Sequence, residues 1–440
     1  MRRGREAFLH SCILAFFAFL ASYPHSVAAQ APPEPVERLT FRQAVDRAIA
    51  NNPSSAVAAA VILRAEGLLS QARSATLLEV TGNVTTTTLN RGVSFEDTTV
   101  TPRNQVAASL TIDQPIVAAA DWARRAQAQD NRDVAVLSAV ETRRQIAVAT
   151  ADAYLAIIAL RQLVEGDIRA RDNARAHFDL ATQLEQQGTG SRLNALRAQQ
   201  QVSTFERNLE VANLAVYRAQ EALGILVVAD GPVDAGEEPV FDVPTDPAAA
   251  GATRAELAPV LLQARPDLRL FTGEEQAAAR VLRDSSKDRW PSLNALFLPQ
   301  SVYPGQFFTS PNNWRFLLQS SIPIFDGGMR SSLRVQRQAA LDVATANLAG
   351  GITQASSEVR AARESVASGL RALAAAQRAA QEAQQVVNIV NISFGAGAAT
   401  NIEVIDAERS ARDADTAVAA AEHILRRARL DLLQALGRFP

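Results

Sequence analysis

The sequence predicts a mainly α-helical protein with a small β part, built from a duplicated unit of helix, β-hairpin, long helix and returning helix. Three observations predict this class. Proline is absent from two stretches of equal length, 116–231 and 324–439, so both can form long helices. A glycine pair interrupts each stretch. Only 5% of the residues are aromatic and alanine is abundant, which favours closely packed helices over a thick globular core.

The composition argues against several partners and chemistries. The 440 residues carry 44 basic and 46 acidic side chains, a net charge of −2, whereas nucleic-acid-binding chains are usually basic. The sequence contains no Walker A loop, dinucleotide fingerprint or nucleophile elbow. Its two histidines beyond residue 29, His177 and His423, are too far apart in sequence to favour a zinc site. We therefore expect no catalytic residues, no metal, no cofactor and no nucleic-acid partner.

Residues 1–29 have the organisation of a secretory signal peptide. Three arginines precede an apolar run over 12–21, and small residues follow at 27–29. Cys12, the only cysteine, lies too early for a lipid-anchored N-terminal cysteine. We therefore expect a mature chain without disulfides or a lipid anchor. No later stretch has 18 consecutive apolar residues, so we expect no transmembrane helix after the signal peptide.

A short segment, 30–38, precedes two matching halves, which we place at 39–226 and 254–437. Aligning Gly188 with Gly397 gives an offset of 209 residues, and both halves end in the same Ala-Leu-Gly triplet. The intervening residues, 227–253, contain four prolines and are interpreted as a linker in an equatorial region.

Each half contains two helices that the glycine pair separates. The long helices are expected at about 120–186 and 327–392, and the returning helices at about 192–225 and 400–436. At 1.5 Å per residue, each long helix spans roughly 100 Å. Apolar residues recur every three or four positions, which is typical of coiled coils. An antiparallel coiled coil with no transport role therefore remains an open alternative.

A β-hairpin is expected before each long helix, at about 79–114 and 292–322. Its strands have about ten residues, the length of a membrane β-strand. A small soluble sheet remains the alternative, because alternation is poor in the first strand. Aromatic residues cluster at the ends of the second hairpin, where a membrane-interface girdle would lie: Trp290, Tyr303, Phe307, Phe308 and Trp314.

The number of strands per chain bears on assembly. Four strands cannot close a barrel, and an open sheet edge is not tolerated in lipid. Two chains would supply eight strands, whose interior side chains fill the barrel, whereas three would supply twelve and leave a lumen. A conduit therefore favours a homotrimer.

Taken together, this organisation and several short phrases resemble the TolC-type outer-membrane efflux family. The phrases are Leu-Thr-Phe-Arg-Gln-Ala at 39–44, Ala-Arg-Pro-Asp-Leu-Arg at 264–269, Ile-Pro-Ile-Phe-Asp-Gly-Gly at 322–328 and Gly-Ala-Ala-Thr-Asn-Ile-Glu-Val-Ile-Asp-Ala at 397–407. The resemblance implies a trimeric 12-stranded β-barrel in the cell outer membrane, continuous with a periplasmic α-helical coiled-coil barrel. It also implies contacts with outer-membrane lipid, a periplasmic adaptor (membrane fusion) protein and an inner-membrane pump.

The resemblance implies a gated aperture at the periplasmic tip, lined by acids on the second returning helix. Their motif positions fall on Glu403 and Asp406, which are three apart and share a helix face. In a trimer each would form a ring of three like charges that favours cations. The alternative is a solvated helix face, paired with arginines.

The first half supplies counterparts to these acids. By the 209-residue offset, Asn194 matches Glu403 and Arg197 matches Asp406. We hypothesise that Arg197 pairs with one of these acids to hold the tip closed, or that Arg192 takes that role. Phe394 ends the second long helix, and its role can be either gating or packing of the last turn. The glycines of the tip turns permit positive φ, let an adaptor hairpin approach closely, or do both. The turns contain Gly188, Thr189, Gly190, Gly395, Gly397 and Ala398.

The function expected from the resemblance is that of an exit duct in a tripartite efflux or type I secretion system. It would export small molecules or polypeptides passively and would not be an enzyme. A periplasmic coiled-coil adaptor or scaffold without a pore is the alternative.

Overall fold

The structure, a computed structural model, describes residues 36–96, 98–243, 254–307 and 309–439. Apart from Glu37 at the start of β1, the helices and sheets described below belong to one compact unit, Arg38–Pro440. The expected signal peptide and residues 30–35 of the segment 30–38 lie outside the described residues, as does part of the expected linker.

One order of elements occurs twice along the chain: two helices, two paired strands, a long helix and a returning helix. Pro53 and Pro266 each stand at the start of the second helix, where a fixed φ and a missing N–H are tolerated. The elements are β1 (Glu37–Leu39), α2 (Phe41–Asn51), α3 (Pro53–Ser74), β2 (Glu79–Thr88), β3 (Val93–Phe95), β4 (Thr98–Thr101), β5 (Asn104–Val117), α4 (Ala119–Gln186), α5 (Arg192–Val227), β6 (Val233–Ala235), α6 (Arg254–Ala264), α7 (Pro266–Arg283), the 3-10 helix η2 (Asp284–Arg289), β7 (Ser292–Tyr303), β8 (Asn312–Ser321), α8 (Met329–Gly395) and α9 (Asn401–Ala435).

The two long helices, α4 and α8, have 68 and 67 residues, or roughly 100 Å each. The sequence analysis placed the second at about 327–392. The structure starts it later, because Gly327 and Gly328 adopt φ of 64° and 93° and lie before the helix. It also ends later, because Phe394 and Gly395 continue the last turn.

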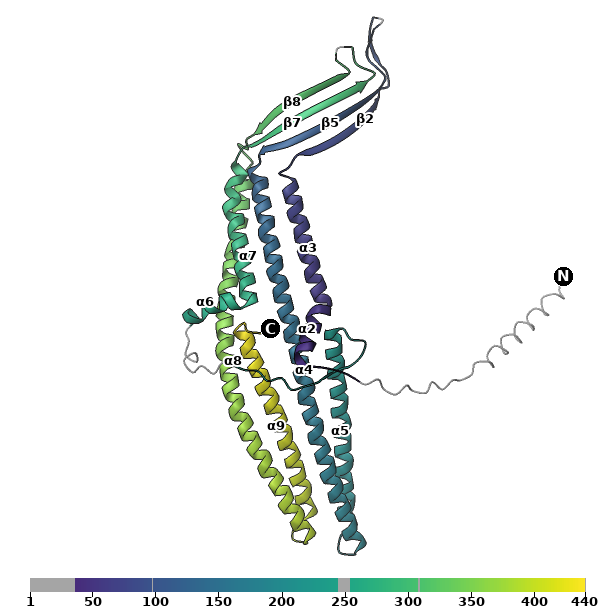
Figure 1. Ribbon diagram of the computed structural model, residues 1–440, viewed down its shortest axis with the longest axis vertical. Coiled ribbons are helices and arrows are strands. Elements are labelled where there is room, and N and C mark those ends of the chain that lie inside the picture. The colour runs from purple at the N-terminus through teal and green to yellow at the C-terminus, as the bar shows by residue number, and fades with distance from the viewer. Residues whose placement is uncertain (1–35, 97, 244–253, 308, 440) are drawn as a thin grey trace, which may run out of the picture. The chain divides into compact units, whose positions relative to one another are not determined.

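Four strands form one antiparallel sheet in the order β2-β5-β7-β8. Glu79 pairs with Asp113 on β5, Val106 of β5 pairs with Tyr303 on β7, and Ser292 pairs with Ser321 on β8. The structure adds a short ribbon of β3 and β4 between β2 and β5, which the sequence analysis did not expect. Figure 1 shows the sheet at one end of the long helices and the turns into α5 and α9 at the other.

Both outer strands of this sheet are uncovered. Every residue of β2 and nearly every residue of β8 is exposed. The exposed side chains include large apolar ones, such as Val84 at 75% and Phe316 at 62%. Within the described residues, the sheet therefore has two unpaired edges, on β2 and β8, and apolar side chains that no other element covers.

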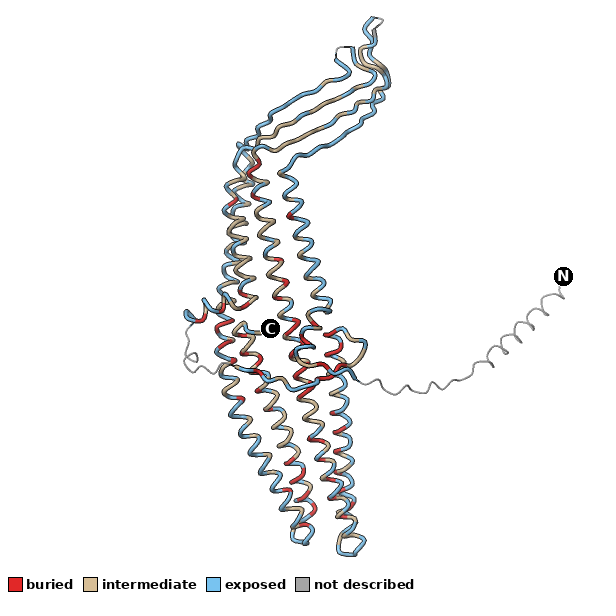
Figure 2. The backbone as a smooth tube through the Cα atoms, viewed as in Figure 1, coloured by how far each residue is buried: buried red, intermediate tan, exposed pale blue. Residues whose placement is uncertain are grey.

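The main apolar core lies midway along α4, where α2, α5 and β6 pack against it. Figure 2 shows this concentration of buried residues. Tyr154 is fully buried, and its hydroxyl lies 3.1 Å from the carbonyl oxygen of Leu39 and accepts the N–H of Glu237 at 3.1 Å. Phe41 packs edge-on against the Tyr154 ring, with 5.4 Å between centroids. A second cluster joins α6 and α7 to α8 and α9.

Strand β6 lies inside the segment 227–253 that the sequence analysis interpreted as a linker. All three of its residues are buried. Asp234 forms an ion pair with Arg161 of α4, and the side chains on either side of it, Val233 and Ala235, belong to the main core. This part of the segment is therefore a packed component of the fold.

Two helices, α3 and α4, are long and apolar enough to cross a membrane by length and composition alone. The sequence analysis expected none, because it required an unbroken apolar run. In α4, 44% of the most apolar window is buried, so these side chains serve packing within the chain. In α3 the corresponding share is 6%, so its apolar residues are mostly exposed.

Candidate functional site

Two tight turns reverse the chain at the end of the helices opposite the sheet (Figure 1). One joins α4 to α5 and the other joins α8 to α9. Gly188 and Gly397 occupy the same position in the two turns, each with a φ of 75°. The amide of Gly190 donates to the carbonyl of Leu184 at 2.8 Å, which closes the first turn. Side chains with a Cβ disfavour this left-handed backbone, so both turns depend on glycine.

The second turn ends in a capping box at the start of α9. The Thr400 hydroxyl accepts the N–H of Glu403 at 3.4 Å, and the Glu403 carboxylate accepts the N–H of Thr400 at 2.6 Å. These hydrogen bonds to the ionised form lower the pKa of Glu403. Sequence reasoning missed this role, although Thr-x-x-Glu before a helix is its signature. Asp406 lies three residues further along α9 and is exposed.

The two arginines proposed as latches lie on the exposed surface of α5. Arg192 and Arg197 are both exposed, and within the described residues neither forms an ion pair with Glu403 or Asp406. The proposed pairing of Arg197 is therefore not formed inside one chain. It stays a prediction for contacts between copies.

A cavity of about 380 Å³ lies between the two tips. It brings together several residues that the sequence analysis named, but Arg192, Arg197, Glu403 and Asp406 are not among its lining residues. Ala181 and Leu184 of α4 complete one wall. The named residues that line it are Thr189, Gly190, Asn194, Phe394, Gly395 and Gly397.

Phe394 belongs to a buried cluster that joins three helices at the tip. The ring of His177 on α4 packs edge-on against Phe394 of α8, with 4.9 Å between centroids. Its Nε2 lies 2.7 Å from Oδ1 of Asn401, the first residue of α9. Burial lowers the pKa of His177. Sequence reasoning overlooked this cluster, although His177 was one of only two histidines in the predicted mature chain.

Polar contacts continue from this cluster along the line where α4 packs against α9, which we call the α4–α9 seam (α4 residues 162–177 and α9 residues 401–422). The Asp167 carboxylate is 2% exposed and accepts from Arg412 at 2.8 Å. Arg169 pairs with Asp415 at 3.1 Å. Because each contact joins one helical hairpin to the other, the seam sets how closely the two tips approach.

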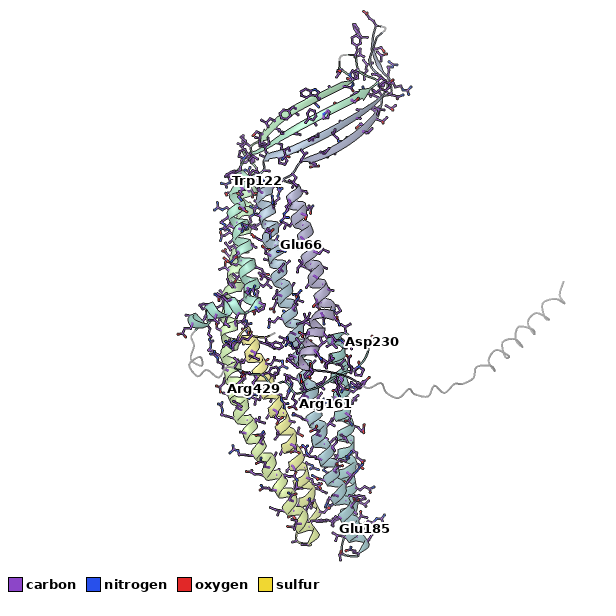
Figure 3. All side chains as sticks on the ribbon, in the orientation of Figure 1. Glu66, Trp122, Arg161, Glu185, Asp230 and Arg429 are labelled. Atoms are coloured by element: carbon purple, nitrogen blue, oxygen red, sulfur yellow. The ribbon has the colours of Figure 1, made fainter. Side chains whose placement is uncertain are left out.

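The aromatic residues of the second hairpin lie at both ends of its strands. Trp290 lies two residues before β7 and is 59% exposed, at the end of the sheet near the helices. Trp122, in the first turn of α4, lies at the same end (Figure 3). Tyr303 and Trp314 lie toward the far ends of β7 and β8, and both are largely exposed. Phe307 is exposed in the connecting loop, whereas Phe308 lies outside the described residues.

Comparison with known sequences gives a consistent family. Residues 257–438 match a sequence model of the family described as outer membrane efflux protein. Outer membrane protein OprJ of Pseudomonas aeruginosa is 26% identical over 272 residues, which cover 58% of this chain and 52% of OprJ. Outer membrane protein TolC of Vibrio cholerae is 24% identical over 174 residues, which cover 36% of this chain and 40% of TolC. The matched regions thus span about half the length of these relatives or less.

Solved structures have the same fold over nearly the whole chain. The outer membrane protein VceC of Vibrio cholerae superposes with a TM-score of 0.76 at 19% identity, covering 90% of this chain and 96% of VceC. The CmeC outer membrane channel of Campylobacter jejuni gives 0.78 at 16% identity, covering 91% of this chain and 86% of CmeC. CusC gives 0.80 at 17% identity, with 93% and 95% covered. These relatives are named as outer membrane proteins and channels, which agrees with a role other than catalysis. Residues 257–438 thus match the outer membrane efflux protein family, and the whole chain resembles TolC-type proteins of the outer membrane in its fold.

Proposed function

We propose that three copies of this chain form a duct through the outer membrane that exports small molecules or polypeptides passively and is gated at the tips. The observation that carries the proposal is the four-stranded antiparallel sheet with its unpaired edges on β2 and β8. The strands alternate in direction, so β8 of one copy can pair antiparallel with β2 of the next. Three copies then close a 12-stranded barrel, which removes every edge from lipid.

The exposed side chains of the sheet support a membrane location for this barrel. Large apolar residues on strands are costly in water, but they suit the outer face of a barrel in lipid. Trp290 at one end of the strands, and Tyr303 and Trp314 toward the other, suit the two interfacial aromatic bands of such barrels. A periplasmic scaffold without a pore would leave these side chains in water, so the duct is the better explanation.

At the opposite end, the tips supply the residues of a gate. Glu403 and Asp406 are exposed on one face of α9 and have no ion-pair partner within the described part of their own chain. Around a three-fold axis, each would form a ring of three carboxylates that attracts cations. Arg192 and Arg197 of a neighbouring copy are the candidate partners that hold this ring closed.

We infer that the duct serves a tripartite efflux or type I secretion system, with a periplasmic adaptor and an inner-membrane pump. The family name efflux protein supports this role. Helices of roughly 100 Å suit a structure that crosses much of the periplasm. The tip turns also have space, because a Cβ added at Gly188, Gly395 or Gly397 would meet nothing within 4 Å. A helical hairpin of an adaptor could therefore approach closely.

Cysteine cross-linking between the outer strands tests the barrel. A cysteine at Val84 on β2 is combined, one at a time, with cysteines at successive positions from Trp314 to Ser320 on β8. We expect covalent trimers after mild oxidation at one register and its neighbours only. Each single-cysteine variant serves as the control and should give no trimer. A chain that stays monomeric at every register in outer-membrane preparations would contradict the proposal.

A further inference from the structure

Glu408 is the one carboxylate of the α4–α9 seam that lies buried without a partner. Its side chain is on α9, 3% of the residue is exposed, and neither carboxylate oxygen has a hydrogen-bond partner in the described structure. It borders a cavity of about 650 Å³ with Gly166 and Ala170 of α4 and Gln384 of α8. Burial raises its pKa to about 7.

The charged groups around Glu408 are already paired. On α4, Asp167 pairs with Arg412, Arg169 pairs with Asp415, and Asp172 pairs with Arg171. On α8, the polar residues that line the cavity are the amides Gln381 and Gln384. Helix α5 contributes none of the described residues around the cavity. In the arrangement that the described residues adopt, no cation around the cavity is therefore free to pair with an ionised Glu408.

Of the arginines in these ion pairs, Arg412 lies one helical turn from Glu408 on α9. The two residues are four apart on α9, and a glutamate that precedes an arginine by four positions is a favoured helix pair. In the described structure the Arg412 guanidinium instead donates across the seam to Asp167 at 2.8 Å. Two buried carboxylates, one on each hairpin, thus compete for a guanidinium that also donates to the exposed Asp413 at 3.4 Å.

We propose that Arg412 exchanges partners and thereby couples proton binding to the closeness of the two hairpins. In the packed state Glu408 is protonated and Arg412 holds Asp167. In the loosened state Glu408 is ionised and pairs with Arg412 along α9, which frees the cross-seam contact. The consequence for transport rests on the proposed function, because loosening the seam would move the tips that carry the gate.

The direction with pH follows from which state holds the proton. The packed seam keeps Glu408 protonated up to about pH 7, whereas a solvated glutamate ionises near 4.5. Raising the pH between these values favours the loosened state. The packed-to-loosened ratio falls by at most a few hundredfold, since each tenfold drop in proton concentration contributes up to tenfold. His177 acts in the opposite direction, because burial lowers its pKa and acid therefore weakens its packing.

The experiment measures the distance between the hairpins against pH, which does not depend on whether the protein conducts. Spin labels at Gln183→Cys on α4 and Ser410→Cys on α9, both exposed positions, are introduced into chains diluted with unlabelled copies. We expect the label distance to lengthen as the pH rises from 4 to 8, with a midpoint between 4.5 and about 7. Glu408→Gln should stay at the short distance throughout.

Two further variants isolate the exchange. Glu382→Gln changes an exposed acid on α8 and should behave as the wild type. Asp167→Asn weakens the contact with Arg412 that holds the packed state, so it should move the midpoint to lower pH. A distance that ignores pH, or a Glu408→Gln variant that still lengthens, would overturn the proposal. An unchanged midpoint in Asp167→Asn would show that Glu408 titrates without any partner exchange. If the distances behave as expected but no channel forms in a bilayer, the proposed function fails and the switch stands.

Discussion

The long helices α4 and α8 occupy equivalent places in the two halves, yet they are buried to very different extents. Nineteen residues of α4 are buried, against seven of α8. Figure 2 shows α8 largely exposed along its length. Its exposed apolar side chains include Val335, Val343 and Leu370. The difference teaches that α4 is the packing centre of the single chain, whereas α8 leaves apolar side chains uncovered within it.

Truncating one leucine in each helix should give the largest difference in stability between α4 and α8. Leu155 of α4 is 1% exposed, so Leu155→Ala should cost about 2–5 kcal/mol of stability through lost burial and a cavity. Leu370 of α8 is 46% exposed, so the same change should cost under about 0.5 kcal/mol within the single chain. Thermal unfolding by circular dichroism measures the difference.

If other copies cover α8, Leu370→Ala should instead lower the temperature at which the trimer dissociates. Unheated and progressively heated samples on gels resolve trimer from monomer. A trimer that dissociates at the wild-type temperature would argue against burial of this part of α8 between copies.

The second prediction compares the glycines of the two tips. A Cβ at Gly190 would lie 2.8 Å from the amide nitrogen of Glu185 and from Cβ of Leu184, so Gly190→Ala should destabilise the first tip by about 1–3 kcal/mol. Gly395 closes α8 with open space around it, so Gly395→Ala should stabilise its helix by about 0.5–1 kcal/mol. Hydrogen exchange of the tip amides should speed up in the first variant only. Equal exchange in the two variants would mean that the tips are packed alike.

The third prediction concerns the N-caps of the returning helices. Ser191 accepts a single hydrogen bond, from the N–H of Leu193, whereas Thr400 takes part in a reciprocal capping box. Each change to alanine should cost about 1 kcal/mol, with the larger loss at Thr400. Hydrogen-exchange protection of the first-turn amides of α9, compared with those of α5, tests which cap contributes more. A larger loss at Ser191 would show that the capping box is not formed in solution.

The smallest expected effect is a pH dependence at His177. Its pKa is lowered by burial, so the packed tip favours the neutral ring, and this contribution is lost as the pH falls below the ordinary value of 6.5. Amides near His177 should therefore exchange faster at pH 5 than at pH 7.5, after correction for intrinsic rates. His177→Gln removes the titration and should show no such change. Acid-induced exchange of equal size in both proteins would assign the effect to another group.

Much of the helical fold could be predicted from the sequence because its signals are long-range and redundant. The proline-free stretches and the paired glycines mark helices whose ends in the structure lie within a few residues of the expected positions. The helix boundaries at the glycines were predicted least well, since Gly327 and Gly328 lie outside α8 whereas Gly395 belongs to it. Only the φ angle distinguishes a glycine inside the helix from one outside it, and φ cannot be read from the residue type.

The site was predicted less well, because its contacts join residues far apart in the chain. Nothing local to His177 indicates that Asn401 and Phe394 will surround it. The same is true of Asp167 and Arg412, which are 245 residues apart. The repeat offset and its charge drew attention to Arg197, yet an arginine on an exposed helix face has many possible partners. The capping box at Thr400 was different, since its signature is local and could have been recognised.

Single-channel current in a planar bilayer tests the central claim most directly. The purified protein is measured beside Glu403→Gln/Asp406→Asn, which removes both charges while keeping the side chains nearly the same size. We predict a small, cation-preferring current for the wild type and a larger current with less cation preference for the variant. A well-folded protein that conducts in neither form would contradict the duct, and a current indifferent to the two substitutions would contradict the gate at these acids.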